Sequence, residues 1–243
     1  MKWLVRISIG LGVISCLLVA LAGPAYQAGL VSLELALLRG FRIATLCGLA
    51  AAAVGLVAAI GHLLAKRPGW GGGLLAVILG LAGAAVPLGM RMQVQEVPMI
   101  HDITTDVADP PAFEAVLAAR AGAPNPPDYD PAVAPLQQEA YPDLKPIRVV
   151  QSPAAVMDAA AIIVTDLGWE SVAIDTGAGR IEATDTTRWF GFKDDVVIRV
   201  RSVGGATVVD VRSKSRVGRS DLGKNADRIR AFRHALLESL TAA

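Results

Sequence analysis

Apolar residues form three long runs without a charged side chain in the first ninety residues, 7–33, 43–65 and 68–90. An α-helix rises 1.5 Å per residue, so each run can cross a hydrocarbon core of about 30 Å. We therefore expect three membrane-spanning helices that contact the lipid bilayer through residues 7–22, 43–65 and 68–90. Glycines such as Gly48, Gly55, Gly80 and Gly83 should let these helices pack closely within the chain.

From Ile147 onward, the spacing of apolar residues is typical of a soluble domain. Val196, Ile198 and Val200 alternate with Arg199 and Arg201, which predicts a strand with one apolar face. Further strands are expected at 147–150, 169–175, 180–187 and 207–215, with helices at 153–166 (N-capped by Ser152) and 224–241. This order of elements predicts an α+β fold, an antiparallel sheet with helices on one face.

Residues 92–146 separate the two regions and are rich in proline and acid. The prolines exclude long regular elements, although an extended segment at 99–105 and a short helix at 112–120 fit the pattern. We interpret this stretch as an arm packed on the domain. The expected organisation is a three-helix membrane anchor (1–91), the arm (92–146) and the α+β core (147–243).

Charge divides the chain in the same way. Residues 1–91 hold seven bases and one acid, whereas the remainder holds sixteen bases and twenty-one acids, so the overall charge of +1 is a cancellation. Nucleic-acid binding is not expected, because it needs excess cation where the phosphates dock. Both cysteines lie in apolar runs and histidines are few, so the sequence indicates no metal site and no cofactor.

Basic residues also indicate the orientation of the anchor. Lys2 and Arg6 precede the first run, and Lys66-Arg67 lies between the second and third, on the same side. The positive-inside rule makes that side cytoplasmic, which places the C-terminal domain in the periplasm of a bacterium, held at the inner membrane. Residues 20–22 also resemble a signal-peptide cleavage site, and cleavage there would not change the topology. His62, four residues before Lys66, should reach the membrane interface.

The densest candidate site is the segment 184–195, which contains Arg188, Trp189, Lys193, Asp194 and Asp195. Asp194 or Asp195 as a general base with Arg188 as an electrostatic stabiliser would suit a hydrolase or an isomerase. Neighbours in a strand point to opposite faces, which argues against a shared substrate for the two carboxylates. The structural alternative is a hairpin with Gly191 in the turn and Asp194 paired with Arg188 or Lys193.

A second candidate is the segment 213–225, with Arg216, Arg219, Ser220 and Asn225 before the last helix. Arginines and free amides at a helix N-terminus can hold phosphate or carboxylate groups, and a basic face can also lie on anionic lipid head groups. The structural alternative is that Asp221 or Asn225 caps the helix while Arg216 and Arg219 pair with acids of the arm. His101 and Asp102 form a third, smaller polar cluster.

Several separated motifs resemble one family. They are residues 100–106 (IHDITTD), Asp109-Pro110-Pro111 with Phe113, residues 184–201 (TDTTRWFGFKDDVVIRVR) and residues 210–229 (DVRSKSRVGRSDLGKNADRI). Over about 97–240 the chain is similar to domain-of-unknown-function family 1499, whose bacterial members often follow membrane spans. The resemblance implies an extracytoplasmic module on an anchor, and it implies no activity, cofactor or catalytic residue.

These observations predict a membrane-anchored periplasmic protein that binds or scaffolds rather than catalyses. The expected partner is an envelope protein, a lipid or an anionic ligand, bound through the 188–195 and 216–225 regions, with His101 and Asp102 nearby. The alternative is the hydrolase or isomerase that uses Asp194 or Asp195. No catalytic residue is assigned from the sequence.

Overall fold

The computed structural model describes residues 2–242 and divides into two units. The first contains the residues up to Gln95 together with Trp189–Gly191, and the second contains Glu96–Arg188 and the residues from Phe192 onward. The boundary in the chain therefore falls at the end of the third apolar helix, a few residues after the change in charge at Arg91.

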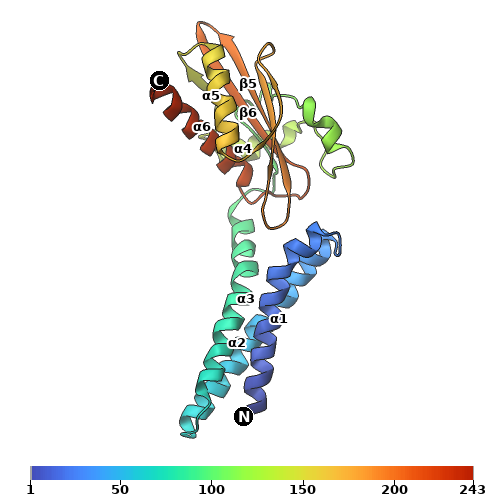
Figure 1. Cartoon of the computed structure of the whole chain (residues 1–243), viewed down its shortest axis with the longest axis vertical. Helices are drawn as coiled ribbons and strands as arrows, with labels where there is room; N and C mark the ends of the chain where they lie inside the picture. Colours follow the sequence, from blue (N-terminus) through green and yellow to red (C-terminus); the bar gives the residue numbers. More distant parts are fainter. Residues whose placement is uncertain (1, 243) are drawn as a thin grey trace. The chain divides into compact units, whose positions relative to one another are not determined.

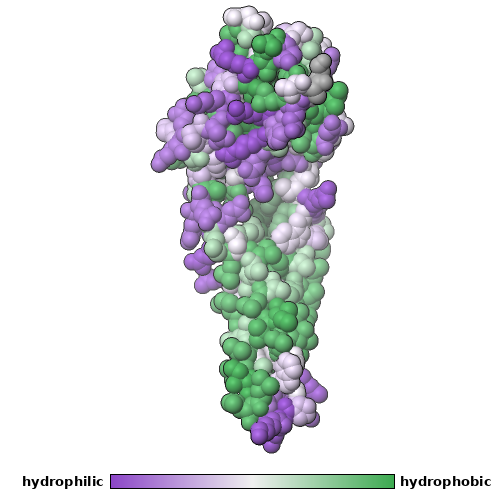
Figure 2. All heavy atoms as spheres, turned by 90° about the vertical axis from the view of Figure 1, so that its left-hand side faces the viewer, coloured by the Kyte–Doolittle hydropathy of each residue, from purple (hydrophilic) through white to green (hydrophobic). Residues whose placement is uncertain are grey.

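The first unit is built from three long apolar helices (Figure 1). They are α1 (Lys2–Gln27), α2 (Phe41–Leu64) with a π-helical segment before it (Glu34–Gly40), and α3 (Trp70–Glu96). All three are long and apolar enough to cross a membrane, as the sequence predicted. Figure 2 shows apolar side chains over their surface and mainly polar ones over the C-terminal domain. Helix α3 continues past Arg91 because the residues there are good helix formers, and it ends two residues before Pro98.

Glycines let α2 and α3 approach closely. A Cβ atom on Gly48 would lie only 2.5 Å from the carbonyl oxygen of Gly80, and one on Gly55 only 2.7 Å from that of Gly73. The Ser15 hydroxyl of α1 donates a hydrogen bond to the Ala44 carbonyl of α2 at 2.7 Å. Small residues thus hold the helices together within the chain, as expected from their spacing.

The second unit is an α+β domain, as predicted. Its strands are β1 (Asp102–Thr104), β2 (Ile147–Val149), β3 (Glu170–Asp175), β4 (Arg180–Thr186), β5 (Lys193–Val203) and β6 (Ala206–Ser215). Its helices are α4 (Ala134–Ala140), α5 (Pro153–Asp166), α6 (Lys224–Ala242) and two 3₁₀ turns (Ala115–Arg120 and Pro131–Val133). The helix expected at 112–120 is therefore a shorter 3₁₀ helix.

The six strands form one antiparallel sheet in the order β1-β6-β5-β4-β3. Strand β2 also pairs with β6, so β1 and β2 share one edge of β6. The hairpin between β5 and β6 turns at Gly204 and Gly205, whose φ values of 60° and 81° suit a two-residue hairpin loop. Consecutive strands β3 to β6 thus pair with their neighbours in sequence, as a meander.

The apolar core lies between one face of the sheet and the helices α5 and α6 (Figure 1). Val196, Ile198 and Val200 of β5 point into it, as their alternation predicted. Helix α5 begins at Pro153 with the Ser152 hydroxyl accepting the Ala155 N–H at 3.3 Å. The α6 residues Ile229, Phe232, Leu236 and Leu240 are all buried in this core, which confirms the predicted helix face. The opposite face of the sheet is polar, and the arm covers it.

Candidate functional site

Charged side chains line the polar face of the sheet and are almost completely buried there. The β-sheet alternation brings Asp195 of β5 beside Lys214 of β6 and Thr184 of β4, and it brings Asp102 of β1 beside Lys214. Asp195 has no exposed surface, and Arg212 and Lys214 are 2% and 3% exposed. Charges at this depth need partners, because a buried charge without a partner lowers the stability of the fold by about 3–5 kcal/mol.

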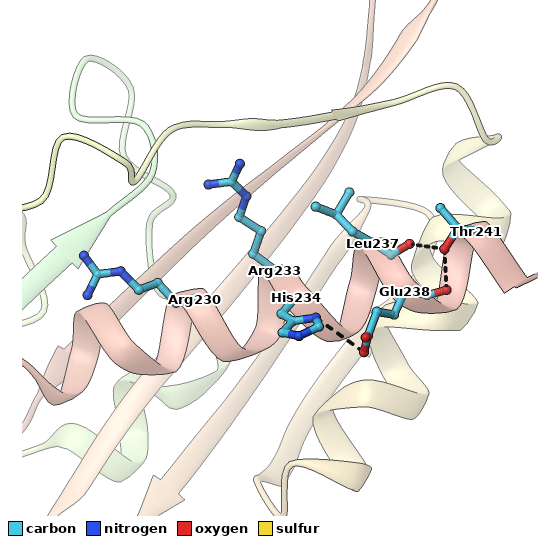
Figure 3. A pocket seen from close by; sticks show the side chains of 6 residues that line it. All are labelled: Arg230, Arg233, His234, Leu237, Glu238 and Thr241. Carbon is cyan, nitrogen blue, oxygen red and sulfur yellow. Dashed lines mark hydrogen bonds and ion pairs between the residues drawn. The ribbon is translucent and has the colours of Figure 1, made fainter.

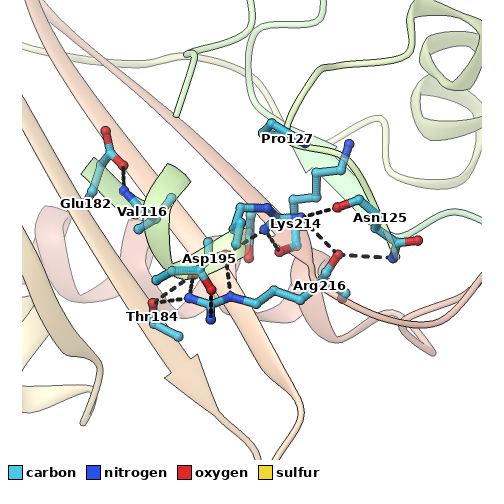
Figure 4. A network of polar contacts seen from close by, with 12 residues as sticks. Val116, Asn125, Pro127, Glu182, Thr184, Asp195, Lys214 and Arg216 are labelled. Atoms are coloured by element: carbon cyan, nitrogen blue, oxygen red, sulfur yellow. Dashed lines mark hydrogen bonds and ion pairs between the residues drawn. The ribbon is translucent and has the colours of Figure 1, made fainter. Parts of the chain in front are cut away.

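Asp195 forms ion pairs with two arginines, Arg120 and Arg216, and Figure 4 shows it beside Arg216 and Thr184. Nη1 of Arg120, from the arm, donates to its Oδ2 at 2.6 Å. Arg216 donates from Nη2 to Oδ1 at 2.7 Å and from Nε to Oδ2 at 2.9 Å. The Thr184 hydroxyl donates to Oδ1 at 2.7 Å. Two cations and four hydrogen bonds therefore surround this one carboxylate.

The pKa of Asp195 reflects this environment. Burial alone raises the pKa of the carboxyl, but the hydrogen bonds from Arg216, Thr184 and Arg120 and the charge of Arg216 lower it, and their sum holds it below the usual range. A carboxylate of lowered pKa is a weak proton acceptor near neutral pH. Asp195 is therefore suited to holding the arm and the sheet together.

Asp102 organises a second buried cluster. Arg212 donates to its two oxygens at 2.9 and 2.8 Å, and Lys214 Nζ lies 3.0 Å from Oδ2. The same two cations reach arm carbonyls, Arg212 those of Pro111 and Pro127, and Lys214 that of Asp128 at 2.6 Å. Burial lowers the pKa of Lys214, although the charge of Asp102 opposes the shift. The arm thus supplies the acceptors that the buried cations need.

Two more clusters extend this ionic layer across the sheet. Arg199 and Arg201 both contact the buried Asp210 of β6, at 3.0 and 2.6 Å, and both reach Asp106 and Asp109 of the arm. The carboxylate of Glu182, on β4, accepts the backbone N–H groups of Glu114 and Val116 at 2.8 and 3.0 Å (Figure 4). Arg199 and Arg201 therefore point away from the apolar core as predicted, yet they face the arm.

Asp194 lies on the other side of β5. Arg228 of α6 donates to it at 2.8 Å and to Asp185 of β4 at 2.6 Å. The side-chain Oδ1 of Asn225 accepts from the Ser213 hydroxyl and from Arg228 Nη1, both at 2.6 Å. The expected pairing of Asp194 with Arg188 or Lys193 is therefore wrong, because Arg228 reaches the carboxylate from the helix that covers this face.

The two adjacent carboxylates do not converge on one substrate. Asp194 and Asp195 point to opposite faces of the sheet, and each is paired with buried arginine. Arg188, the stabiliser that the hydrolase or isomerase hypothesis required, is an exposed residue of the loop between β4 and β5. Nothing in this arrangement supports that hypothesis. Trp189 lies in the same loop, with its ring 5.1 Å from that of Phe190.

The loop between β6 and α6 is held by its own capping residue, Asp221, and by the segment that connects α3 to β1. Asp221 accepts the N–H groups of Gly223 and Asn225 at 2.9 and 2.8 Å, which confirms that it caps α6. Burial raises the pKa of Asp221 despite these hydrogen bonds. The His101 carbonyl accepts from Ser215 N and from Asn225 Nδ2, both at 3.0 Å, and Ser220 Oγ lies 3.5 Å from the Pro98 carbonyl.

The prediction that Arg216 and Arg219 pair with acids of the arm is wrong for both residues. Arm acids do pair with arginines of the sheet, but Arg216 pairs with Asp195 and meets the arm through backbone groups. Its Nη1 donates to the Ala119 carbonyl at 2.8 Å, and its own carbonyl accepts the Asn125 N–H at 3.1 Å. Arg219 is exposed and makes no ion pair among residues 2–242. Lys193 and Lys224 are exposed in the same way. Of the predicted site residues, Arg188, Lys193 and Arg219 are therefore exposed.

A shallow groove of about 580 Å³ runs along α6 (Figure 3). Arg230 and Arg233 line it, with Arg230 paired to Asp143 at 2.8 Å and Arg233 donating to the Asp143 carbonyl at 3.1 Å. His234 lies 3.3 Å from Glu238, one turn further along the helix. The cations here are engaged by neighbours in the domain. Residues 2–242 hold no cluster of three or more acidic, histidine or cysteine side chains suited to a metal ion.

Sequence reasoning missed four cations that organise the interior, namely Arg120, Arg212, Lys214 and Arg228. The alternation of Asp210, Arg212 and Lys214 along β6, continued by Arg216 directly after the strand, was visible and marks a polar sheet face. The arm buries this face, and its residues are far in the sequence from the strand residues that they contact. Arg120 and Arg228 carry no local signal, because each lies on a helical turn beside unremarkable neighbours.

A family comparison matches this domain. The model of the family described as "Protein of unknown function (DUF1499)" matches residues 102–236. The match covers more than half of the chain and includes the sheet, most of the arm and most of α6. No curated protein matches the chain. The chain therefore belongs to the DUF1499 family, whose common function is unknown.

Proposed function

We propose that this protein is a binding or scaffolding module of the bacterial inner membrane, whose C-terminal domain lies in the periplasm and binds an anionic partner. Three helices able to cross a membrane support the anchor. Lys2, Arg6, Lys66 and Arg67 fall on one side of these helices, which supports a cytoplasmic N-terminus. An odd number of spans then carries the domain to the opposite side.

The proposed binding surface consists of Lys193, Arg219 and Lys224, which we call the cationic rim. Lys193 begins β5, Arg219 lies in the loop after β6 and Lys224 begins α6. Backbone pairing joins these segments, because Arg216 N donates to the Lys193 carbonyl at 2.9 Å and Lys224 N donates to the Asp221 carbonyl at 3.1 Å. The rim is the observation that carries the proposal, since its three side chains are exposed and have no ion pair within residues 2–242.

The chain enters the domain beside this rim. Residues 97–101 connect α3 to β1, and within the domain Ile100 O accepts the Asp221 N–H at 3.3 Å. This short connection favours a partner at the membrane surface, where exposed lysine and arginine are attracted to anionic lipid by about 1 kcal/mol each. Anionic lipid head groups are therefore the first candidate, followed by an acidic face of an envelope protein.

Topology and binding can be tested in the full-length protein. A reporter that is active only in the periplasm, fused after Ala243, should be active, and activity of a cytoplasm-only reporter would refute the orientation. Photo-crosslinkers placed at positions 193 and 219 should capture lipid or an envelope protein in cells. Crosslinkers at Lys145 and Arg148, exposed bases elsewhere on the domain, are the matched control. Equal capture at both pairs of positions would refute the binding surface.

A further inference from the structure

A cavity of about 670 Å³ lies at the end of the anchor where the chain begins. Lys2, Trp3 and Arg6 of α1, His62 of α2, and Arg67 and Pro68 of the turn before α3 line it. The volume is in the range of sites for small organic ligands, about 300–1,000 Å³. This cavity lies wholly within the first unit and is separate from the cationic rim of the domain.

The cations that line the cavity have no counter-ion in their own unit. The sequence from residue 2 to residue 95 contains one acid, Glu34. That carboxylate pairs with Arg39, at 3.1 Å, in the π-helical segment that leads into the opposite end of α2. Lys2, Arg6 and Arg67 thus gather around one cavity with only solvent or an external anion to balance them.

His62 provides an independent sign of a missing partner. Its side chain is only 4% exposed, and neither ring nitrogen has a hydrogen-bond partner among the described residues. His62 lies in the last turn of α2, beside Lys2 and Arg67, and the expectation that it reaches the membrane interface stays a prediction. Gly69 holds the ring in place, because a Cβ at this position (φ 127°) would lie 2.8 Å from Cε1 of His62. A buried donor left without an acceptor is costly, so the ring is positioned for a ligand oxygen.

We propose that this cavity binds the phosphate of an anionic phospholipid. The phosphate oxygens would accept hydrogen bonds from Arg6, Arg67 and a ring N–H of His62, and Lys2 would add charge. Trp3, which lines the cavity, is 62% exposed and offers apolar surface to the acyl chains. A phospholipid can thus supply both the anion that the cations need and acyl chains that contact the exposed ring of Trp3.

The test uses the full-length protein in detergent and native mass spectrometry of its lipid complexes. One equivalent of phosphatidylglycerol should bind, and phosphatidylcholine should bind far more weakly. Arg6→Gln with Arg67→Gln should weaken the complex roughly 30-fold, from two lost charges. His62→Phe, which keeps the ring on Gly69 but removes the N–H, should weaken it about tenfold. Arg39→Gln with Arg42→Gln removes the same charge at the other end of α2 and should have no effect.

A second measurement does not depend on the variants. A photoactivatable phosphatidylglycerol should label residues 2–9 and 62–70 of the wild-type chain. Labelling of 34–42 instead, equal binding of phosphatidylcholine, or an equal loss in the Arg39/Arg42 control would each overturn the proposal. Inorganic phosphate is the competing source of the anion. If millimolar phosphate displaces the lipid and its own binding is lost in the Arg6/Arg67 variant, the site is a soluble-phosphate site and the lipid assignment is overturned.

Discussion

Asp195 should be the most stability-critical carboxylate of the domain, and Asp195→Asn tests this directly. The side chain is fully buried, and it neutralises Arg120 and Arg216, whose side chains are 1% and 13% exposed. An asparagine keeps the volume but removes the charge, and its amide group would point N–H donors at the guanidinium groups. Two buried cations would then lose their anion.

The expected cost follows from this geometry. Removing one partner of a buried ion pair typically costs about 3–5 kcal/mol, because the remaining charge stays desolvated. Asp194→Asn is a control in the adjacent residue of the same strand. It leaves Arg228 with a second carboxylate, Asp185 at 2.6 Å, so we expect a smaller loss of about 1–3 kcal/mol. Asp195→Asn removes the carboxylate that Arg120 and Arg216 share, whereas Asp194→Asn removes one of the two carboxylates that pair with Arg228.

Pulse proteolysis of the full-length protein across a urea series measures the free energy of unfolding of the C-terminal domain without removing the anchor. Trp169 fluorescence gives a second readout, because its ring is buried and stacks on Phe232 at 6.1 Å. The reasoning would be refuted if Asp195→Asn were no more destabilising than Asp194→Asn. It would also be refuted if both variants unfolded within about 0.5 kcal/mol of the wild type, the usual range of surface substitutions.

The destabilisation caused by Asp195→Asn should also depend on pH. The folded-state pKa of Asp195 is lowered, so its contribution to stability is complete above the unfolded-state pKa of about 3.9 and is lost as the pH falls through the folded-state pKa. The difference in stability between the wild type and Asp195→Asn should therefore be constant near neutral pH and shrink below about pH 4. A difference that stayed unchanged down to pH 2 would show that the carboxylate charge is not responsible.

Substitutions at three further positions, two of them with a matched control, test the core of the domain, the cap of α5 and the helix packing of the anchor. Phe232→Ala should destabilise the domain by about 3–5 kcal/mol in the same urea series, because it empties a fully buried site beneath the sheet. Ser152→Ala should cost about 1 kcal/mol through loss of the N-cap of α5, whereas Ser152→Asp, which keeps an acceptor, should cost less. Gly80→Val should lower resistance of the anchor to denaturing detergent, since its Cβ would meet the backbone of α2, and Gly89→Val, with open space around its Cβ, should leave it unchanged.

Much of the fold could be read from the sequence, because it depends on local chemistry. Ser152 followed by Pro153 marks the start of α5, and Gly204-Gly205 marks the turn between β5 and β6. The alternation around Ile198 assigns one face of β5 to the core, since neighbouring side chains in a strand point to opposite faces. Long apolar runs indicate membrane helices by length alone. In each case the signal lies within a few residues.

The partners of the charged residues could not be read in this way. The sequence showed that Asp194 and Asp195 should face opposite sides of a strand, but their partners are Arg228 and Arg120, and Arg120 is 75 positions from Asp195. Asp102 and Arg212 are 110 positions apart. Pairings over such distances depend on how the arm folds onto the sheet, which no local pattern encodes.

The sequence by itself thus determined where the chain can enter a membrane, that an α+β domain of opposite net charge follows, and which face of each strand is apolar. Hydrophobic periodicity and local turn chemistry are sufficient for those conclusions. Only the tertiary structure decided which charges are buried and neutralised and which, such as Lys193 and Arg219, remain exposed. The physical reason is that a charge is satisfied by whatever lies within about 4 Å in space, and distant segments supply those neighbours.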